Sequence, residues 1–324
     1  MQQFFRLTGI DAVPAALKGA LVAIGNFDGI HRGHQLVFGR LKALAHERGV
    51  PAVVVTFEPH PRDVFAPAPF LFRLTEADAK ARLVEALGLD AILVLPFSQP
   101  FAQMEPEDFV QTILLDALGV SGVIVGHDFH FGRQRRGTPE FLRAAGAEQG
   151  FWVETLDLLD HEAAPISSSR IRTALEAGNL DTANRLLGYH WFIEGEVVGG
   201  DQRGRELGYP TANLATGPAF SLAQGVYAVR GMLGDRLLDG VAAFGKPMFG
   251  NARPPFETFF FDFSGDIYGQ HLLVALLGHI RGQEVFAGLP ELISAMDRDS
   301  MQARRIITAA APLGELDRKL GFFG

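Results

Sequence analysis

The chain lacks cysteine altogether, and it holds only two Trp and four Tyr among its 324 residues. Without thiols it can form no disulfide, no thiolate metal site and no cysteine nucleophile, and a reducing cytoplasm fits this composition. No apolar run approaches the ~20 residues of a membrane span. The first six residues also lack the basic stretch and apolar core of a signal peptide. We therefore expect a cytoplasmic protein that does not enter a membrane.

Two common nucleotide-binding motifs are missing as well. No two glycines are separated by one residue, which excludes G-x-G-x-x-G, and the single Gly-Lys pair is followed by Pro247, which excludes a Walker A sequence. The chain also lacks an excess of basic residues, since 29 Lys and Arg stand against 37 Asp and Glu and the net charge is −8. This balance argues against a general nucleic-acid binder. Any chemistry on ATP must use another scaffold.

Apolar residues, by contrast, are plentiful: they make up 48% of the chain, and 27 residues are Phe. That content is enough for sizeable cores, and a length of 324 residues favours two domains.

One stretch near the start combines a strand, a glycine-rich turn and a helix. Leu21–Ile24 is a short apolar run typical of a buried strand, and apolar residues recur at helical spacing over 35–48. Between them, residues 25–34 read Gly-Asn-Phe-Asp-Gly-Ile-His-Arg-Gly-His. Free N–H groups and the helix dipole make such a helix start an anion site, and the glycines let a ligand approach the backbone. His31 and His34 add side-chain donors there.

Taken alone, these two histidines have a plainer interpretation. A His pair at a helix start often serves only in capping or at the surface, and this pair has no nearby Cys or Glu to complete a zinc site.

The first half of the chain alternates strands with helices. The expected strands are 52–57, 91–95, 122–125 and 151–155, and the expected helices are 75–87, 105–118 and 138–149. Such alternation predicts an α/β domain with a parallel sheet and helices on both faces, in which ligands bind beyond the carboxyl ends of the strands. The loops at 25–34, 58–62 and 126–137 all follow strands, so we expect them along one edge.

Two further segments could extend an anion site at that edge. Residues 126–137 contain three arginines, whose forks suit phosphate, although such a cluster is as often a solvated face. Residues 165–172 place three serines and two arginines at the start of a helix, where the hydroxyls cap the helix and can also bind an anion. A break at 178–181 and a short helix follow, and we place the domain boundary at residue 188.

The second half changes character. Short β runs appear at 193–198, 226–230, 237–244, 256–263 and 271–276, separated by turn residues. Their spacing predicts a small antiparallel β-barrel within a domain of residues 189–324. Leu289–Ile307 has the pattern of an amphipathic C-terminal helix.

Four strings in the first half point to a known family. They are Phe-Asp-Gly-Ile-His-Arg-Gly-His at 27–34, Phe-Glu-Pro-His-Pro at 57–61, Gly-His-Asp-Phe-His-Phe-Gly at 126–132 and Ile-Ser-Ser-Ser-Arg-Ile-Arg at 166–172. Together they resemble the adenylyltransferase half of the bacterial bifunctional riboflavin kinase/FMN adenylyltransferase (FAD synthetase) family, and the first resembles the HxGH nucleotidyltransferase signature. The resemblance implies a Rossmann-like nucleotidyltransferase domain over 1–188. There the two His residues hold the ATP triphosphate while FMN takes the adenylyl group and pyrophosphate leaves.

The second half carries a further string, Gly-Tyr-Pro-Thr-Ala-Asn at 208–213, which resembles the riboflavin kinase domain of the same family. The resemblance implies that Thr211 and Asn213 coordinate Mg²⁺ with ATP, an ion that keeps few protein ligands. Glu257 precedes Asp-Phe at 262–263 and Tyr-Gly at 268–269, and so matches the family's catalytic base for the ribityl hydroxyl. Met248 stands where the family often has Thr.

The resemblance also distributes the roles of the site residues. Catalytic roles fall to His31, His34 and Glu257. Contacts to ATP or its phosphates fall to Gly25, Phe27, Asp28, Gly33, Ser167, Ser168, Ser169, Arg172, Gly208 and Pro210. Flavin contacts fall to His60, Asp128, Phe129 and Arg133, and metal binding to Thr211 and Asn213.

The function implied is a two-step synthesis in which riboflavin is phosphorylated to FMN and FMN is adenylylated to FAD. Riboflavin, FMN and ATP are the expected small-molecule partners, with Mg²⁺ as the cofactor and no nucleic acid or membrane involved. One alternative is a single-activity FMN adenylyltransferase with a flavin-binding barrel, which Met248 supports. A flavin store without enzymatic activity is another, although it would not need both the His pair and the serine-rich segment. The sequence gives no oligomeric state.

Overall fold

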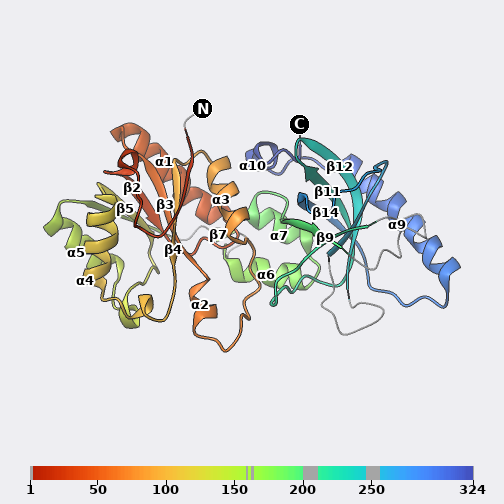
Figure 1. Ribbon diagram of the computed structural model, residues 1–324, viewed down its shortest axis with the longest axis horizontal. Coiled ribbons are helices and arrows are strands. Elements are labelled where there is room, and N and C mark those ends of the chain that lie inside the picture. Colours follow the sequence, from red (N-terminus) through yellow and green to blue (C-terminus); the bar gives the residue numbers. More distant parts are fainter. Residues whose placement is uncertain (1–2, 158–159, 162–163, 200–210, 246–255, 324) are drawn as a thin grey trace. The chain divides into compact units, whose positions relative to one another are not determined.

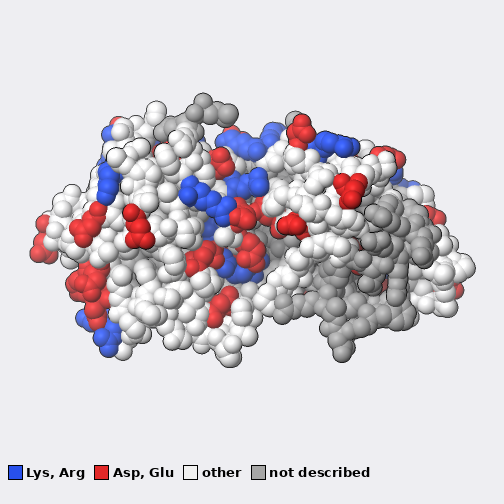
Figure 2. Space-filling model, in the orientation of Figure 1, with Lys and Arg blue, Asp and Glu red and all other residues white. Residues whose placement is uncertain are grey.

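The protein consists of two compact units, residues 1–167 and 168–324. A computed structural model describes the backbone at residues 3–157, 160–161, 164–199, 211–245 and 256–323 (Figure 1). The helices between 168 and 187 belong to the second unit. A functional boundary at residue 188 stays a prediction. On the face drawn in Figure 2, Lys and Arg lie interspersed with Asp and Glu, in keeping with the mixed charge of the sequence.

The first unit is built on a parallel sheet with the strand order β1-β4-β3-β2-β5-β6. The strands are β1 (Phe5–Thr8), β2 (Leu21–Ile24), β3 (Ala52–Glu58), β4 (Ala91–Pro96), β5 (Gly122–Gly126) and β6 (Trp152–Leu156). Every residue of β2 is buried, as expected for a strand covered on both faces. The predicted α/β class is therefore confirmed, with one strand, β1, that the sequence analysis did not include.

Helices cover both faces of this sheet. They are α1 (Arg32–Arg48), α2 (Pro61–Val64), α3 (Ala77–Ala86), α4 (Pro106–Phe109), which continues as the π-helix η3 (Val110–Leu118), and α5 (Pro139–Gln149). Short 3₁₀ turns are η1 (Ala15–Leu17), η2 (Phe101–Gln103) and η4 (Arg133–Arg135), and a small hairpin pairs β7 (Asp160–His161) with β8 (Ala164–Pro165). Right-handed crossovers put α1 and α3 on one face and α4, η3 and α5 on the other (Figure 1).

The strand order brings three predicted loops together. β2 lies between β3 and β5, so the loops at 25–34, 58–62 and 126–137 leave the carboxyl ends of three adjacent strands. The chain also changes direction here, since β3 and β4 lie to one side of β2 and β5 and β6 to the other. This is a topological switch point, where open parallel sheets bind ligands.

The second unit is a closed antiparallel barrel with the order β10-β13-β12-β11-β14-β9. Its strands are β9 (Phe192–Val198), β10 (Thr211–Leu214), β11 (Gly225–Leu233), β12 (Arg236–Phe244), β13 (Phe256–Phe260) and β14 (His271–Gly282). Its helices are α6 (Ser168–Glu176), α7 (Leu180–Leu187), α9 (Leu289–Ala309) and α10 (Glu315–Lys319). The predicted barrel and C-terminal helix are confirmed.

Three strands of the barrel differ by several residues from the sequence-based prediction, and one of them is β11, which runs to Leu233 and not to residue 230. β13 ends at Phe260 and not at residue 263, because a turn begins at Phe261 and Asp262 adopts a left-handed φ of 55°. β14 runs to Gly282 and pairs with β11 along its length, with two register shifts. The short strand β10, which the sequence presents as a polar segment, pairs with both β9 and β13 and so closes the barrel.

Candidate active sites

The turn between β2 and α1 has a tightly constrained backbone. Phe27 and Ile30 adopt left-handed φ values of 47° and 36°, which β-carbon-bearing residues rarely adopt, and Gly29 lies between them at 84°. The ring of Phe27 lies across Gly25, where a Cβ would come within 3.0 Å of Cζ. Phe27 is 6% exposed and packs edge-on against His34 and Phe38, so its ring holds the turn against α1.

His31 and His34 come together at the start of α1. Their rings stack with centroids 3.7 Å apart, and His31 is the N-cap residue of the helix. The Nδ1 atoms of both rings are buried and have no hydrogen-bond partner among the described residues. Burial lowers the pKa of His31 to about 4, although Asp28 opposes the shift, and burial also lowers the pKa of His34 well below its usual value. The site therefore presents two neutral imidazoles beside free helix N–H groups.

The other residues of this turn support the pair. Gly33 has no Cβ, and one built there would lie 3.2 Å from Cε1 and Nδ1 of His31, so glycine gives the ring its space. Asp28, expected at the phosphates, is 2% exposed, and its Oδ1 accepts hydrogen bonds from the backbone N–H groups of Leu74 and Thr75, each at 3.0 Å. In this structure its carboxylate anchors a neighbouring loop.

The expected flavin residues lie on the two flanking loops. His60 is 6% exposed and its Nδ1 accepts a hydrogen bond from Arg62 N at 3.2 Å. Phe129 stacks on Phe131 with ring centroids 5.6 Å apart. Asp128 lies in the turn after β5, where its Oδ1 would be 3.0 Å from a Cβ on residue 126.

The fourth of these residues, Arg133, is half-exposed and donates to Glu105 Oε1 at 3.1 Å. Arg136 donates to the other oxygen of the same carboxylate at 3.0 Å. Two arginines of this loop are therefore paired at the surface, as the solvated-face interpretation expects.

Two aromatic side chains at this edge were not predicted. Phe65 and Phe70 follow β3 and are 62% and 54% exposed, which is unusual for rings of this size. Phe65 meets Phe97 edge-on at 6.2 Å between ring centroids, and the guanidinium of Arg62 lies 5.5 Å from the centroid of Phe70. The signal for them was two Phe in a proline-containing segment directly after Phe-Glu-Pro-His-Pro.

The serine-rich segment falls at the division between the two units. Ser167 ends the first unit, whereas Ser168, Ser169 and Arg172 begin α6 in the second. α6 starts at Ser168 as the capping pattern predicted. The joint action of this segment with His31 and His34 stays a prediction.

The expected kinase residues gather on the outer face of the barrel. Asn213 on β10 and Glu257 on β13 are directly opposite each other, and Thr211 lies two residues along β10 on the same face. Asn213 is 4% exposed and its Oδ1 has no hydrogen-bond partner among the described residues, whereas Glu257 is exposed. Gly208, Pro210 and Met248 lie outside the described residues.

An orphaned amide oxygen beside a threonine hydroxyl and a carboxylate fits Mg²⁺, which prefers oxygen ligands and takes few from the protein. Across the described residues no three His, Cys, Asp or Glu side chains gather as a metal site.

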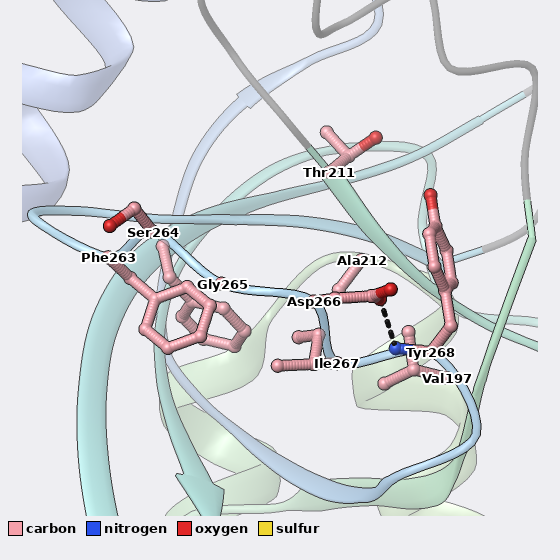
Figure 3. Close-up of a pocket in the computed structure, with 10 residues that line it drawn as sticks. Val197, Thr211, Ala212, Phe263, Ser264, Gly265, Asp266, Ile267 and Tyr268 are labelled. Atoms are coloured by element: carbon pink, nitrogen blue, oxygen red, sulfur yellow. Dashed lines mark hydrogen bonds between the residues drawn. The ribbon is translucent and has the colours of Figure 1, made fainter.

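A cavity of about 410 Å³ opens beside Thr211 (Figure 3). Val197, Phe263 and Ile267 supply apolar surface, and Asp266 accepts a hydrogen bond from Tyr268 N at 3.1 Å. Figure 3 shows the hydroxyl groups of Thr211 and Tyr268 on one side of this cavity, with the Phe263 ring facing it from the opposite wall. Such a mixture of apolar walls and a few polar groups is typical of small-molecule sites.

Two family models match the chain in succession. The model described as FAD synthetase matches residues 13–170, and the model described as riboflavin kinase matches residues 187–307. A bifunctional riboflavin kinase/FMN adenylyltransferase from Pseudomonas fluorescens is 39% identical over 296 residues, which cover 91% of this chain and 95% of the relative. The chain belongs to the bifunctional riboflavin kinase/FMN adenylyltransferase family.

Further members of this family match over similar lengths. The Escherichia coli K12 protein of the same name is 37% identical, with 92% of this chain and 96% of the relative covered. The Bacillus subtilis protein is 35% identical, with 88% and 92% covered. A solved structure named a macrolide-efflux protein, from Streptococcus pneumoniae, is 29% identical with a TM-score of 0.80, covering 93% of this chain and 98% of that one. None of the helices in the described parts of the chain is both long and apolar enough to cross a bilayer.

Proposed function

We propose that the chain makes FAD from riboflavin in two steps, each on its own unit. The second unit phosphorylates riboflavin with ATP to give FMN, and the first unit transfers AMP from a second ATP to FMN, releasing pyrophosphate. The observation that supports two separate centres is that His31 and His34 stack in the first unit, whereas Asn213 and Glu257 face each other in the second. As a finer proposal, the enzyme works in the cytoplasm.

In the adenylyl transfer, the phosphate chain of ATP binds at the start of α1. Its oxygens accept hydrogen bonds from the free N–H groups of the first helical turn and from His31 and His34. These donors sit where charge develops as the bond between the α-phosphorus and the bridging oxygen breaks. The FMN phosphate oxygen attacks the α-phosphorus from the opposite side, and pyrophosphate leaves with its charge held at the helix.

The FMN ring system needs an apolar platform at the same edge. We propose that the exposed Phe65 provides it, together with His60 and Phe129 from the flanking loops. Arg133 joins them only if its ion pair with Glu105 opens, since both partners are engaged with each other. Gly25 and Gly33 give space to the rings of Phe27 and His31, which lie at this site.

In the kinase step, Glu257 takes the proton of the ribityl 5′-hydroxyl, whose oxygen attacks the γ-phosphorus of ATP. Thr211 and Asn213 would hold Mg²⁺, and the ion would neutralise phosphate charge there. We propose that the cavity beside Thr211 takes the adenine of the same ATP, because Thr211, Phe263 and Tyr268 all line it.

Two variants separate the two centres. Glu257→Gln keeps the shape of the side chain but removes the base, so FMN formation from riboflavin should fall by ~10²–10⁴ while FAD formation from supplied FMN is unchanged. His34→Ala should show the reverse and stop at FMN, with a loss of ~10²–10³ in adenylylation. Both products are measured by chromatography after incubation with ATP and Mg²⁺, starting from riboflavin and from FMN.

The same experiment decides between the candidate functions. FAD from supplied FMN without FMN from riboflavin would point to a single-activity adenylyltransferase. Unchanged flavin in every reaction would point to a flavin-binding protein. If folded Glu257→Gln protein lost FAD formation from FMN, the assignment of one activity to each unit would be wrong.

A further inference from the structure

A buried network of ionised side chains lies beneath the glycine-rich turn and takes no part in the steps above. Lys80 Nζ donates to Glu58 Oε1 at 2.7 Å, and the Arg73 guanidinium donates to both carboxylate oxygens of Glu58, at 2.7 and 2.9 Å. The Lys80 side chain is 1% exposed and that of Arg73 9%. Arg73 Nε also lies 3.8 Å from Asp28 Oδ1, and the carboxylate of Glu76 interacts electrostatically with the same groups.

One arm of this network reaches the start of the turn. Lys80 Nζ donates to Thr56 Oγ1 at 3.2 Å, and Thr56 Oγ1 in turn donates to the carbonyl oxygen of Asn26 at 3.1 Å. Thr56 is fully buried, so no water competes with these contacts. Asn26 immediately precedes Phe27, the first residue with left-handed φ.

The other arm reaches the middle of the turn. Arg73 donates to Thr75 O at 3.3 Å, and Thr75 Oγ1 accepts a hydrogen bond from Gly29 N at 2.9 Å. Asp28, which lies between Asn26 and Gly29, accepts hydrogen bonds from the backbone N–H groups of Leu74 and Thr75. Residues 26–29 are thus bound from both ends by side chains that lie far away in the sequence.

Such a network is not explained by stability alone. Buried ion pairs often contribute little net stability, because the desolvation of the charges offsets their attraction. A turn with two β-carbon-bearing residues at left-handed φ, however, persists only if its surroundings fix it. His31 and His34 follow this turn directly, and a displacement of about 1 Å in a catalytic group can cost ~10²-fold in rate.

We propose that Lys80 is a positioning residue for adenylyl transfer. Acting through the Thr56 hydroxyl, it fixes the Asn26 carbonyl and with it the turn that aims the stacked His31 and His34 at the phosphates of ATP. Glu58 and Arg73 hold Lys80 in place and bind the far end of the turn. This role rests on the proposed adenylyltransferase function of the first unit.

The test uses two substitutions of Thr56 with opposite effects on packing and on hydrogen bonding. Thr56→Val keeps the volume and removes the hydroxyl, whereas Thr56→Ser keeps the hydroxyl and loses a buried methyl group. We expect kcat for FAD formation from FMN to fall about tenfold in Thr56→Val, with KM for FMN and ATP within about twofold. Thr56→Ser should keep kcat near the wild-type value. Its thermal midpoint should nevertheless fall at least as far as that of Thr56→Val.

A rate that followed the thermal midpoint in both variants would overturn the proposal, because it would mark a purely structural role for the hydroxyl. Equal kcat in wild type and Thr56→Val would overturn it as well. Wild-type enzyme that made no FAD from FMN would contradict the proposed function itself, and the positioning role would fall with it.

Lys80→Met tests the charge of Lys80 itself, and Arg40→Met is its control. Met keeps most of the length of Lys but carries no charge, and we expect ~10²-fold slower adenylylation. Arg40 lies on α1 and pairs with Glu154 at the surface, at 3.0 Å, so Arg40→Met removes a paired cation of the same unit without touching the turn. An effect of equal size in both variants would overturn the role of Lys80. If Lys80→Met does not fold, the Thr56 pair decides alone.

Discussion

The imidazole rings of His31 and His34 lie face to face, with centroids 3.7 Å apart and planes 18° from parallel. Burial is the main cause that lowers the pKa of each, and for His34 the adjacent His31 and the buried Lys80 add to it. Both rings are therefore neutral at pH 7, and each can donate only one N–H to phosphate. Stacking fixes the two rings relative to each other before ATP arrives, which is the geometry that electrostatic catalysis requires.

The lowered pKa of His31 should appear in the pH dependence of stability. The folded state binds fewer protons than the unfolded state between pH 6.5 and about 4, so the free energy of unfolding should fall as pH falls through this window. The expected contribution of His31 to this loss is up to about 3 kcal/mol and is complete below about pH 4. Urea unfolding of wild type and His31→Gln at several pH values measures it, and the Gln variant should lose less stability than wild type.

His46→Gln is the comparison variant for this measurement. It removes a histidine that is exposed and lies in the last turn of the same helix, outside the stacked pair. Identical curves for His31→Gln and wild type would show that His31 titrates normally.

Gly33→Ala should separate helix stability from catalysis. Alanine favours the helix by up to about 1 kcal/mol, but its Cβ would press on the His31 ring at 3.2 Å, and that ring is held by its stack on His34. We expect unchanged or slightly raised thermal stability and a loss of about tenfold or more in FAD formation from FMN.

Gly39→Ala is the matched variant. Gly39 lies on the same helix and a Cβ there would meet nothing within 4 Å, so it should gain about 1 kcal/mol with normal activity. Normal adenylylation by Gly33→Ala would mean that His31 can move without consequence.

Asn213→Leu should stabilise the second unit while it inactivates the kinase. The substitution removes an amide oxygen that is buried without a partner, which is worth about 1 kcal/mol in the ligand-free protein. It also removes a proposed Mg²⁺ ligand, so FMN formation from riboflavin should fall by about 10²-fold at any Mg²⁺ concentration. Thermal unfolding and a Mg²⁺ titration of kinase activity test both parts. A destabilised but active variant would refute the metal role.

Asp317 should be essential for the stability of the second unit. Its carboxylate is fully buried and accepts hydrogen bonds from His190 N at 2.8 Å, His190 Nδ1 at 2.9 Å and Leu313 N at 2.7 Å. Asp317→Ala leaves these donors without an acceptor, and we expect a loss of about 3 kcal/mol in the free energy of unfolding. Asp317→Asn should cost less, because its amide oxygen still accepts hydrogen bonds. Equal losses would show that side-chain shape, and not the oxygens, matters.

Much of the fold could be predicted from local sequence patterns. Runs such as Val53–Val55 mark strands buried on both faces, and Gly49 and Gly150 end helices with the left-handed φ that their positions suggest. β1 was missed because Phe5–Thr8 is a four-residue edge strand with only alternate residues partly buried. The stretch 105–118 was predicted as one helix, but no local pattern revealed that its second part is π-helical.

The candidate sites were predictable only as strings of residues. The His-x-Gly-His spacing indicated two donors at a helix start, yet their stacking depends on Gly33 and on the ring of Phe27. Lys80 lies within the predicted helix 75–87, but nothing local to it indicates its ion pair, because its partner Glu58 is 22 residues away. The pairing of Asn213 with Glu257 depends on the register between β10 and β13, two strands that are far apart in the sequence.

The closed barrel also has a consequence for which unit of the enzyme takes part in aggregation when the protein is partly unfolded. A strand at the margin of a sheet offers unpaired N–H and C=O groups to other chains, and closure removes such margins from the barrel. The sheet of the first unit has two such edge strands, β1 and β6. Heat-stressed enzyme should therefore aggregate through intermolecular strand pairing at the edges of the sheet in its first unit, and not through the barrel.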